Sequence, residues 1–190
     1  MFKVSCPNCH HENRPPQVVC EACAKILPFY TMNPFVVFQL TPSEPIDMPS
    51  LDTKYFNLQR LIHPDRVQTA ENKEWEWVNQ HIGQINHAYK ALKHTLPRAK
   101  AAYLYIKDPS LSIEAFDNAD LPMPEISFLQ QIIQLQACPS SNDIKALENS
   151  VLKDLVQSIM VLNSADIVQG IAKLTYVERL HTMSQENSRC

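Results

Sequence analysis

The stretch Leu61-Ile62-His63-Pro64-Asp65-Arg66 lies between two segments with strong helical patterns. On both sides of it, apolar residues recur at spacings of three and four, which is the stripe of an amphipathic helix. The upstream stripe comprises Leu51, Tyr55, Leu58 and Ile62, and the downstream stripe comprises Trp75, Val78, Ile82, Ile85, Tyr89 and Leu92. Two such helices joined by a short loop are predicted to pack antiparallel, stripe against stripe, and to leave the loop exposed.

Pro64 fixes the place where the first of these helices must end. Proline has no N–H to donate, its φ is fixed, and it keeps the preceding His63 out of the α region. The loop is therefore predicted to present the imidazole of His63 and the carboxylate of Asp65 in a constrained arrangement at one end of the helix pair. A helix-ending proline among ordinary polar residues is the alternative interpretation.

A His-Pro-Asp tripeptide between two such helices resembles a J-domain, the module that stimulates ATP hydrolysis by DnaK-type chaperones. The flanking segments 58–60 and 85–92 resemble the HscB branch of this family, whose members are co-chaperones of iron–sulfur cluster assembly. The resemblance runs from about residue 33 to about residue 180. It implies an interaction protein whose ATP site belongs to its partner.

The resemblance also implies a chaperone-binding surface, made of this loop and a basic face on the helix before it. Helix two of J-domains usually carries such a face, and Glu and Asp are nearly absent from residues 53–64. The expected chaperone-binding residues are Lys54, Arg60, His63, Pro64, Asp65 and Arg66. Because the basic face is sparse, the encounter with a DnaK/HscA-type ATPase is predicted to be weak and salt-sensitive. An ordinary solvated face is the alternative.

Four cysteines near the N-terminus form two Cys-x2-Cys pairs separated by ten residues, namely Cys6, Cys9, Cys20 and Cys23. Four thiolates at this spacing predict one structural zinc ion per chain, in a knuckle too small to hold a core alone. Iron in a rubredoxin-like site is the main alternative metal. A redox or disulfide role fits less well, because redox pairs are usually single and disulfides are rare in cytoplasmic chains. A subset of HscB-like proteins carries such a module.

Three further helical stripes follow in the last third of the chain, at residues 126–135, 144–162 and 167–180. The short connections between them predict an antiparallel three-helix bundle. By resemblance, this bundle binds an iron–sulfur scaffold protein of the IscU type. The expected scaffold-binding residues are Leu129, Ile133 and Tyr176. Leucine and isoleucine at helical spacing are usually core residues, which is the alternative.

Together these patterns predict an all-α fold in three parts. A tetracysteine module is expected over residues 1–30, a J-domain helical hairpin over 31–108 and the C-terminal bundle over 118–190. A short first helix is expected at residues 33–40, with Asn33 as its N-cap. Asp47 and Ser164 are the expected N-caps of the second and the last helix.

The composition argues against several classes of function. The chain has 190 residues, a net charge of −3 and 19% charged residues, which is typical of a globular protein that binds neither nucleic acid in bulk nor a membrane surface. No apolar run approaches the ~20 residues of a membrane span, and no signal peptide is visible. The expected location is the cytoplasm, or the mitochondrial matrix for a processed form. Two glycines make neither a P-loop nor a dinucleotide fingerprint.

The leading hypothesis is a co-chaperone, not an enzyme, that stimulates a DnaK/HscA-type ATPase and delivers an IscU-type scaffold to it. A J-domain protein for another client, or a zinc-dependent interaction module, is the alternative. In an enzyme, His63 and Asp65 could make an acid–base pair. The other histidines that could add ligands or bases are His81, His87 and His94. No nucleophile lies in a recognisable elbow, and His87 and His94 have no paired carboxylate beside them, so this hypothesis is the weakest.

Overall fold

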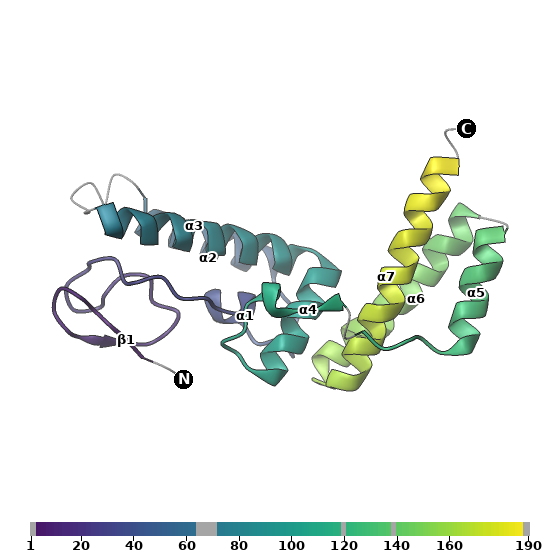
Figure 1. The fold of residues 1–190 in the computed structure, drawn as a ribbon, viewed down its shortest axis with the longest axis horizontal. Helices are drawn as coiled ribbons and strands as arrows, with labels where there is room; N and C mark the ends of the chain where they lie inside the picture. The colour runs from purple at the N-terminus through teal and green to yellow at the C-terminus, as the bar shows by residue number, and fades with distance from the viewer. Residues whose placement is uncertain (1–2, 64–71, 119–120, 138–139, 188–190) are drawn as a thin grey trace. The chain divides into compact units, whose positions relative to one another are not determined.

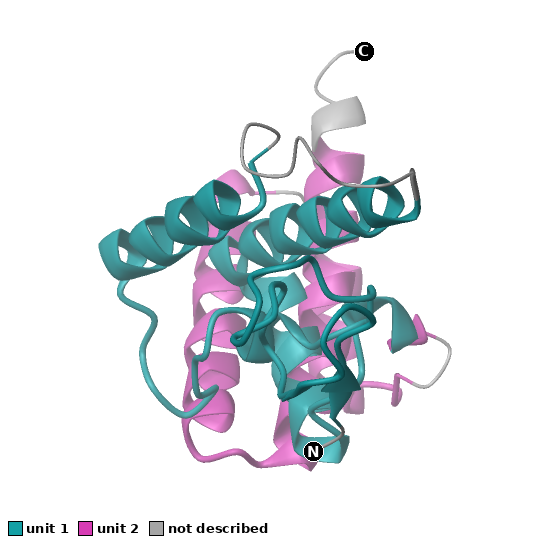
Figure 2. Ribbon diagram, turned by 90° about the vertical axis from the view of Figure 1, so that its left-hand side faces the viewer, with its two compact units in different colours: residues 1–115 teal, residues 116–190 magenta. Residues whose placement is uncertain are grey.

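The computed structural model describes residues 3–63, 72–118, 121–137 and 140–187. The chain divides into two compact units, Met1–Ala115 and Phe116–Cys190, which Figure 2 shows in different colours. The finer division of the first unit into a cysteine module and a J-domain, with boundaries at residues 30 and 108, stays a prediction.

The protein is mostly helical, as predicted, with one small sheet (Figure 1). The first unit contains β1 (Val4–Ser5), β2 (Glu12–Asn13), α1 (Pro34–Val37), α2 (Met48–Leu61), α3 (Asn72–Lys93), α4 (Thr95–Lys107) and the 3-10 turn η2 (Ile113–Ala115). The second unit contains α5 (Ile126–Ala137), α6 (Ser141–Met160) and α7 (Ser164–Asn187). Strands β1 and β2 pair antiparallel. Across the described ranges, every helix is too short or too polar to cross a bilayer.

Helices α2 and α3 pack against each other through the stripes that the sequence predicts. The ring of Tyr55 stacks on that of Tyr89 with 4.2 Å between centroids, and the Tyr89 hydroxyl donates to Asp52 at 2.6 Å. Asn86 Oδ1 accepts from Gln59 Nε2 at 2.8 Å. The contact later in α2, at Gln59, is made to an earlier residue of α3 than the contact at Asp52, so the two helices run antiparallel, as predicted. The fully buried members of the two stripes are Leu51, Ile62, Val78, Ile85 and Leu92.

Two of the predicted N-caps are confirmed. Asn33 Oδ1 accepts from Phe35 N–H, and Asp47 Oδ2 accepts from Ser50 N–H, each at 3.0 Å. Helix α1, however, is a single turn and not the predicted helix over residues 33–40. The chain leaves the helical region at Gln39, which takes the left-handed conformation with φ 50°.

Asn33 also ties α1 to distant parts of the first unit. Its side chain is 0% exposed. Its Nδ2 donates to Ala101 O of α4 at 2.9 Å and to Leu111 O, beyond the end of α4, at 3.2 Å. One carboxamide therefore starts α1 and fixes its position against two later segments.

The second unit is the predicted three-helix bundle. Helices α6 and α7 run antiparallel, because Glu148 Oε2 lies 2.9 Å from His181 Nε2 while Leu155 packs on Gly170. A Cβ at Gly170 would lie 2.8 Å from Leu155 Cδ1, so glycine permits this close approach. The predicted N-cap of α7 is wrong by one residue. Asn163, not Ser164, caps the helix, since its Oδ1 accepts from two backbone N–H groups of the first turn.

Asn33→Ala is expected to lower the free energy of unfolding by about 2 kcal/mol, because it removes the cap of α1 and both donations to distant carbonyls. Urea unfolding followed by circular dichroism measures the change. Asn79→Ala, on the exposed side of α3, is the matched control and should stay within about 0.5 kcal/mol of the wild type. Equal effects of the two substitutions would contradict the role assigned to Asn33.

Candidate functional site

Four cysteine sulfur atoms gather at one point of the first unit. The Sγ atoms of Cys6, Cys9, Cys20 and Cys23 all lie within 4.8 Å of one another. The closest pairs, Cys6 with Cys23 and Cys9 with Cys20, are 3.6 Å apart. Four thiolates bound at about 2.3 Å around a tetrahedral ion lie about 3.8 Å from one another. The structure thus brings the four predicted ligands together in an arrangement that could hold one metal ion.

Two similar turns present these sulfur atoms. In the first turn His10 N–H donates to Cys6 O, and in the second Ala24 N–H donates to Cys20 O, each at 2.9 Å. The residue that follows the last cysteine of each pair takes the left-handed conformation, with φ 59° at His10 and 58° at Ala24. The two Cys-x2-Cys pairs therefore have the same local geometry, and each directs two sulfur atoms to a common point.

The electrostatics of the cluster favour a bound cation. Burial opposes ionisation of Cys20, but backbone N–H groups of its turn and the Asn13 amide outweigh it and lower the pKa of this thiol to about 6. A backbone contact with His11 favours the thiolate of Cys9, yet the neighbouring sulfur atoms raise its pKa to about 12. Because four thiolates repel one another at these distances, full ionisation needs a positive ion between them, which suits a divalent metal.

The cysteine module packs on α3. Leu27 lies in the apolar cluster around the cysteines, and its carbonyl oxygen is 3.1 Å from His81 Nε2. The imidazole of His81 is 0% exposed, between the edge-on rings of Phe29 and Tyr30. Burial lowers the pKa of His81, although the hydrogen bond to Leu27 acts in the other direction. His81 is therefore a buried core residue that joins the module to α3.

His87 has a carboxylate partner that the sequence analysis missed. Its Nδ1 lies 2.6 Å from Glu114 Oε1 of η2. Glu114 is distant in sequence, so no local pattern could reveal the pair. Both side chains are more than half exposed, which makes this an ordinary surface contact.

His63 lies directly after α2. Ile62, the C-terminal cap residue of the helix, is 0% exposed, whereas the His63 side chain is exposed. The helix end is thus held in the core while the imidazole is presented at the surface. The other predicted residues of this loop, Pro64, Asp65 and Arg66, lie outside the described residues.

The face of α2 is partly basic and partly apolar. Arg60 is exposed, as expected. Lys54 is half-buried, because its Nζ donates to Phe38 O at 2.9 Å, beside the end of α1. Phe56 is 61% exposed and Leu61 40% exposed. Phe56 and Arg60 are one helical turn apart and share a face. The sequence analysis missed Phe56, although its position off the buried stripe was a usable signal.

The predicted scaffold-binding residues lie on α5 and α7. Ile133 is 63% exposed, and Leu129 and Tyr176 are half-buried. Ile126, 75% exposed, shares a face of α5 with Leu129 and Ile133 by its spacing. The Tyr176 hydroxyl lies 3.9 Å from the sulfur of Met123, which precedes α5 and is 72% exposed. An exposed apolar stripe therefore exists on α5, where it includes Ile126, and the exposed Met123 lies just before the helix.

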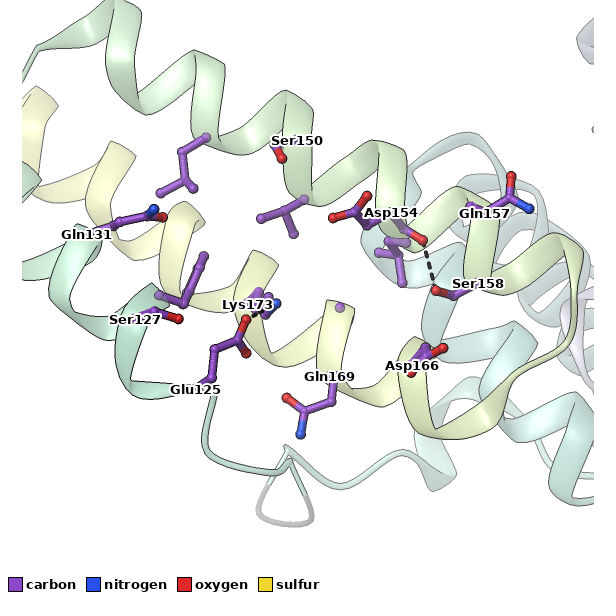
Figure 3. Close-up of a pocket in the computed structure, with 15 residues that line it drawn as sticks. Glu125, Ser127, Gln131, Ser150, Asp154, Gln157, Ser158, Asp166, Gln169 and Lys173 are labelled. Atoms are coloured by element: carbon purple, nitrogen blue, oxygen red, sulfur yellow. Dashed lines mark hydrogen bonds and ion pairs between the residues drawn. The ribbon is translucent and has the colours of Figure 1, made fainter.

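A separate groove of about 480 Å³ opens between α5 and α6, with α7 at its base (Figure 3). Its lining includes the carboxylates of Glu125, Asp154 and Asp166. Lys173 Nζ lies 2.6 Å from Glu125 Oε1 and so ties α7 to the segment that enters α5. None of the three predicted scaffold-binding residues lines this groove, which is therefore distinct from the apolar stripe.

Comparison with known proteins gives a consistent result. No protein-family model matches the chain. The chain is similar to a co-chaperone protein HscB homolog of Pseudoalteromonas atlantica, 42% identical over 160 residues that cover 83% of this chain and 85% of the relative. A protein of the same name from Shewanella loihica is 28% identical over 165 residues, which cover 78% of this chain and 93% of that one.

Two solved structures have the same fold. The crystal structure of human co-chaperone protein HscB matches 97% of this chain and 99% of its own, with a TM-score of 0.74 and 19% identity. Chaperone HscB from Vibrio cholerae matches 83% of this chain and 99% of its own, with a TM-score of 0.60 and 22% identity. The helical fold predicted from the sequence is therefore one that solved proteins adopt.

The burial of His81 predicts a pH-dependent stability. Its folded-state pKa is lowered, so as the pH falls below about 6.5 the unfolded chain binds a proton that the folded chain resists, and stability falls. His81→Gln keeps an N–H donor for Leu27 O but cannot titrate. The melting temperature of the wild type should therefore fall more than that of the variant between about pH 7.5 and about pH 5. His94→Gln, at an exposed position, should keep the wild-type response, and equal pH responses of all three proteins would exclude His81 as the cause.

Proposed function

The chain belongs to the HscB family of co-chaperones, and on that premise we propose that it stimulates ATP hydrolysis by a DnaK/HscA-type chaperone and delivers an IscU-type scaffold to it for iron–sulfur cluster assembly. The observation that carries the proposal is the exposed His63 at the end of the α2–α3 pair, followed in sequence by Pro64 and Asp65. Residues of this chain act by binding, and the ATP site is the partner's. The proposed location is the cytoplasm, or the mitochondrial matrix for a processed form.

The proposed chaperone surface combines charge and apolar contact. Arg60 supplies an exposed cation, and Phe56 and Leu61 supply exposed apolar area beside it. Lys54 contributes less free charge, because it already donates to carbonyls at the end of α1. Asp65 is proposed to accept a charge-assisted hydrogen bond from an arginine of the chaperone. The few cations make the encounter dependent on salt, while the apolar contact is less affected by it.

The proposed scaffold surface is the exposed stripe of α5 with Tyr176. Ile126 is 75% exposed and Ile133 63% exposed, and contiguous exposed apolar surface of this kind is typical of protein interfaces. Tyr176 adds a large ring with a polar tip, a residue type that is frequent at the centre of interfaces. Arg179, whose guanidinium lies over that ring at 5.8 Å from its centre, adds a cation beside it.

The proposed metal is zinc, one ion per chain, held by the four clustered cysteines. Four thiolates in a closed tetrahedral arrangement form a structural site with no open position for a substrate, so the ion stabilises the two turns and takes part in no reaction. Zinc would supply the positive charge that the crowded thiolates need.

Elemental analysis of the purified protein is expected to find about one zinc per chain, and almost none in Cys20→Ser, since three thiolates hold the ion much less tightly. Cys190→Ser changes a cysteine outside the two Cys-x2-Cys pairs and is the control that should keep the metal. Iron in place of zinc would correct the identity of the metal. If the wild-type protein holds neither zinc nor iron, even after reconstitution with each metal, the proposal of a metal site is contradicted.

His63→Gln is expected to abolish stimulation of the chaperone while leaving the fold intact. The side chain is exposed, and substitutions at such positions usually change stability by about 0.5 kcal/mol or less. Single-turnover ATP hydrolysis by the DnaK-type chaperone is measured beside thermal unfolding. His94→Gln should stimulate like the wild type. Full stimulation by a folded His63→Gln protein would contradict the proposal.

Tyr176→Ala is expected to weaken scaffold binding by about 2 kcal/mol, the magnitude of an interface hot spot, with little change in melting temperature because the ring is only half-buried. Titration calorimetry with an IscU-type scaffold measures the affinity. Tyr176→Phe keeps the ring and should retain most of it. If affinity is unchanged, or if Tyr176→Ala unfolds, the docking surface lies elsewhere.

A further inference from the structure

Asn13, at the end of β2, connects the two cysteine turns and is only 1% exposed. Its Oδ1 accepts from Glu21 N–H at 3.0 Å. Its Nδ2 lies 3.0 Å from His11 O, 3.4 Å from Val4 O and 3.6 Å from Cys20 Sγ. One buried carboxamide thus contacts the first turn through carbonyl oxygens, and the second through a backbone N–H and a sulfur ligand.

The partners of this carboxamide fix its orientation and explain why it must be an amide. The N–H of Glu21 can only donate, so the oxygen of Asn13 must face it, and Nδ2 then faces His11 O and Cys20 Sγ. An amide supplies an acceptor for the Glu21 N–H and two hydrogens that the three acceptors around Nδ2 can share. Aspartate has the same shape but would turn an acceptor toward a carbonyl oxygen and a thiolate.

We propose that Asn13 is the positioning residue of the metal site: it donates a hydrogen bond to the Cys20 sulfur and holds the second turn in place against the first. The inference rests on the proposed metal site and assigns a role that the four cysteines do not supply. A hydrogen bond to a thiolate is charge-assisted, so it offsets part of the negative charge that four thiolates concentrate around one ion. Groups that hydrogen-bond to metal ligands commonly orient those ligands and increase the affinity for the metal.

Asn8 offers a matched comparison within the same site. Its side chain lies beside Cys23, the other cysteine of the second pair, but it is exposed. Water can replace an exposed amide, whereas no water replaces a buried one without rearrangement. Comparing variants at Asn13, which is buried and bridges the two turns, with variants at Asn8, which is exposed, therefore distinguishes a positioning role from simple proximity to a sulfur atom.

Competition with a chromophoric chelator measures the Zn²⁺ affinity of the full chain in the wild type and three variants. Asn13→Ala is expected to lose about tenfold and Asn13→Asp up to about 100-fold, while Asn8→Ala loses no more than about threefold. Equal losses at Asn13 and Asn8 would overturn the positioning role. If Asn13→Asp does not assemble the site, Asn13→Ala decides.

The absorption spectrum of the Co²⁺-substituted protein reports on the thiolate ligands themselves, and a loss of stability alone would not shift its bands. At saturating cobalt, the d–d bands report whether the tetrahedral thiolate site has formed. Loss of the Asn13 donor leaves more charge on the Cys20 sulfur, so the thiolate-to-cobalt charge-transfer band is expected to move to longer wavelength. Unchanged affinity and an unchanged band in the Asn13 variants would overturn the inference alone. A wild-type protein that binds neither ion would instead overturn the metal site on which it rests.

Discussion

Helix α3 has to satisfy different neighbours on several faces at once, and the rest of the first unit depends on this. Toward α2 it presents Tyr89 and Asn86, which set the antiparallel pairing. Toward the N-terminal segment it presents His81, which binds Leu27 O, and Gln84, whose Oε1 accepts from Met32 N–H at 2.8 Å. A single apolar stripe contacts one neighbour only. Polar side chains of α3 therefore fix how the other neighbouring segments lie against the helix.

The position of His81 links the cysteine module to the helix pair energetically. Its Nε2 faces a carbonyl oxygen and must carry the proton, so Nδ1 is left as a buried acceptor without a partner in the described part of the chain. A protonated ring would add an unpaired buried N–H and a charge, which burial disfavours. Since Leu27 belongs to the cluster around Cys6 and Cys20, its hydrogen bond to His81 connects the metal site to α3.

Sequence patterns predicted the features that depend on residues close together in the chain. The spacing of apolar residues predicted α2 and α3, the caps at Asn33 and Asp47 followed from adjacent residues, and two Cys-x2-Cys pairs predicted the sulfur cluster. Features that depend on distant partners were not predictable. Asn33 as a tie to α4, the Glu114 partner of His87 and the bridge at Asn13 each join residues that only folding brings together. The scaffold-binding role of Leu129 and Tyr176 stays a prediction, because exposure alone does not identify a partner.

The central claim is that a helix pair carrying His63 stimulates ATP hydrolysis by a partner chaperone. Single-turnover ATP hydrolysis by a DnaK-type chaperone tests it most directly, with and without the folded, metal-loaded protein. We expect the protein to accelerate hydrolysis by the chaperone. An unchanged hydrolysis rate with the folded, metal-loaded protein would contradict the claim.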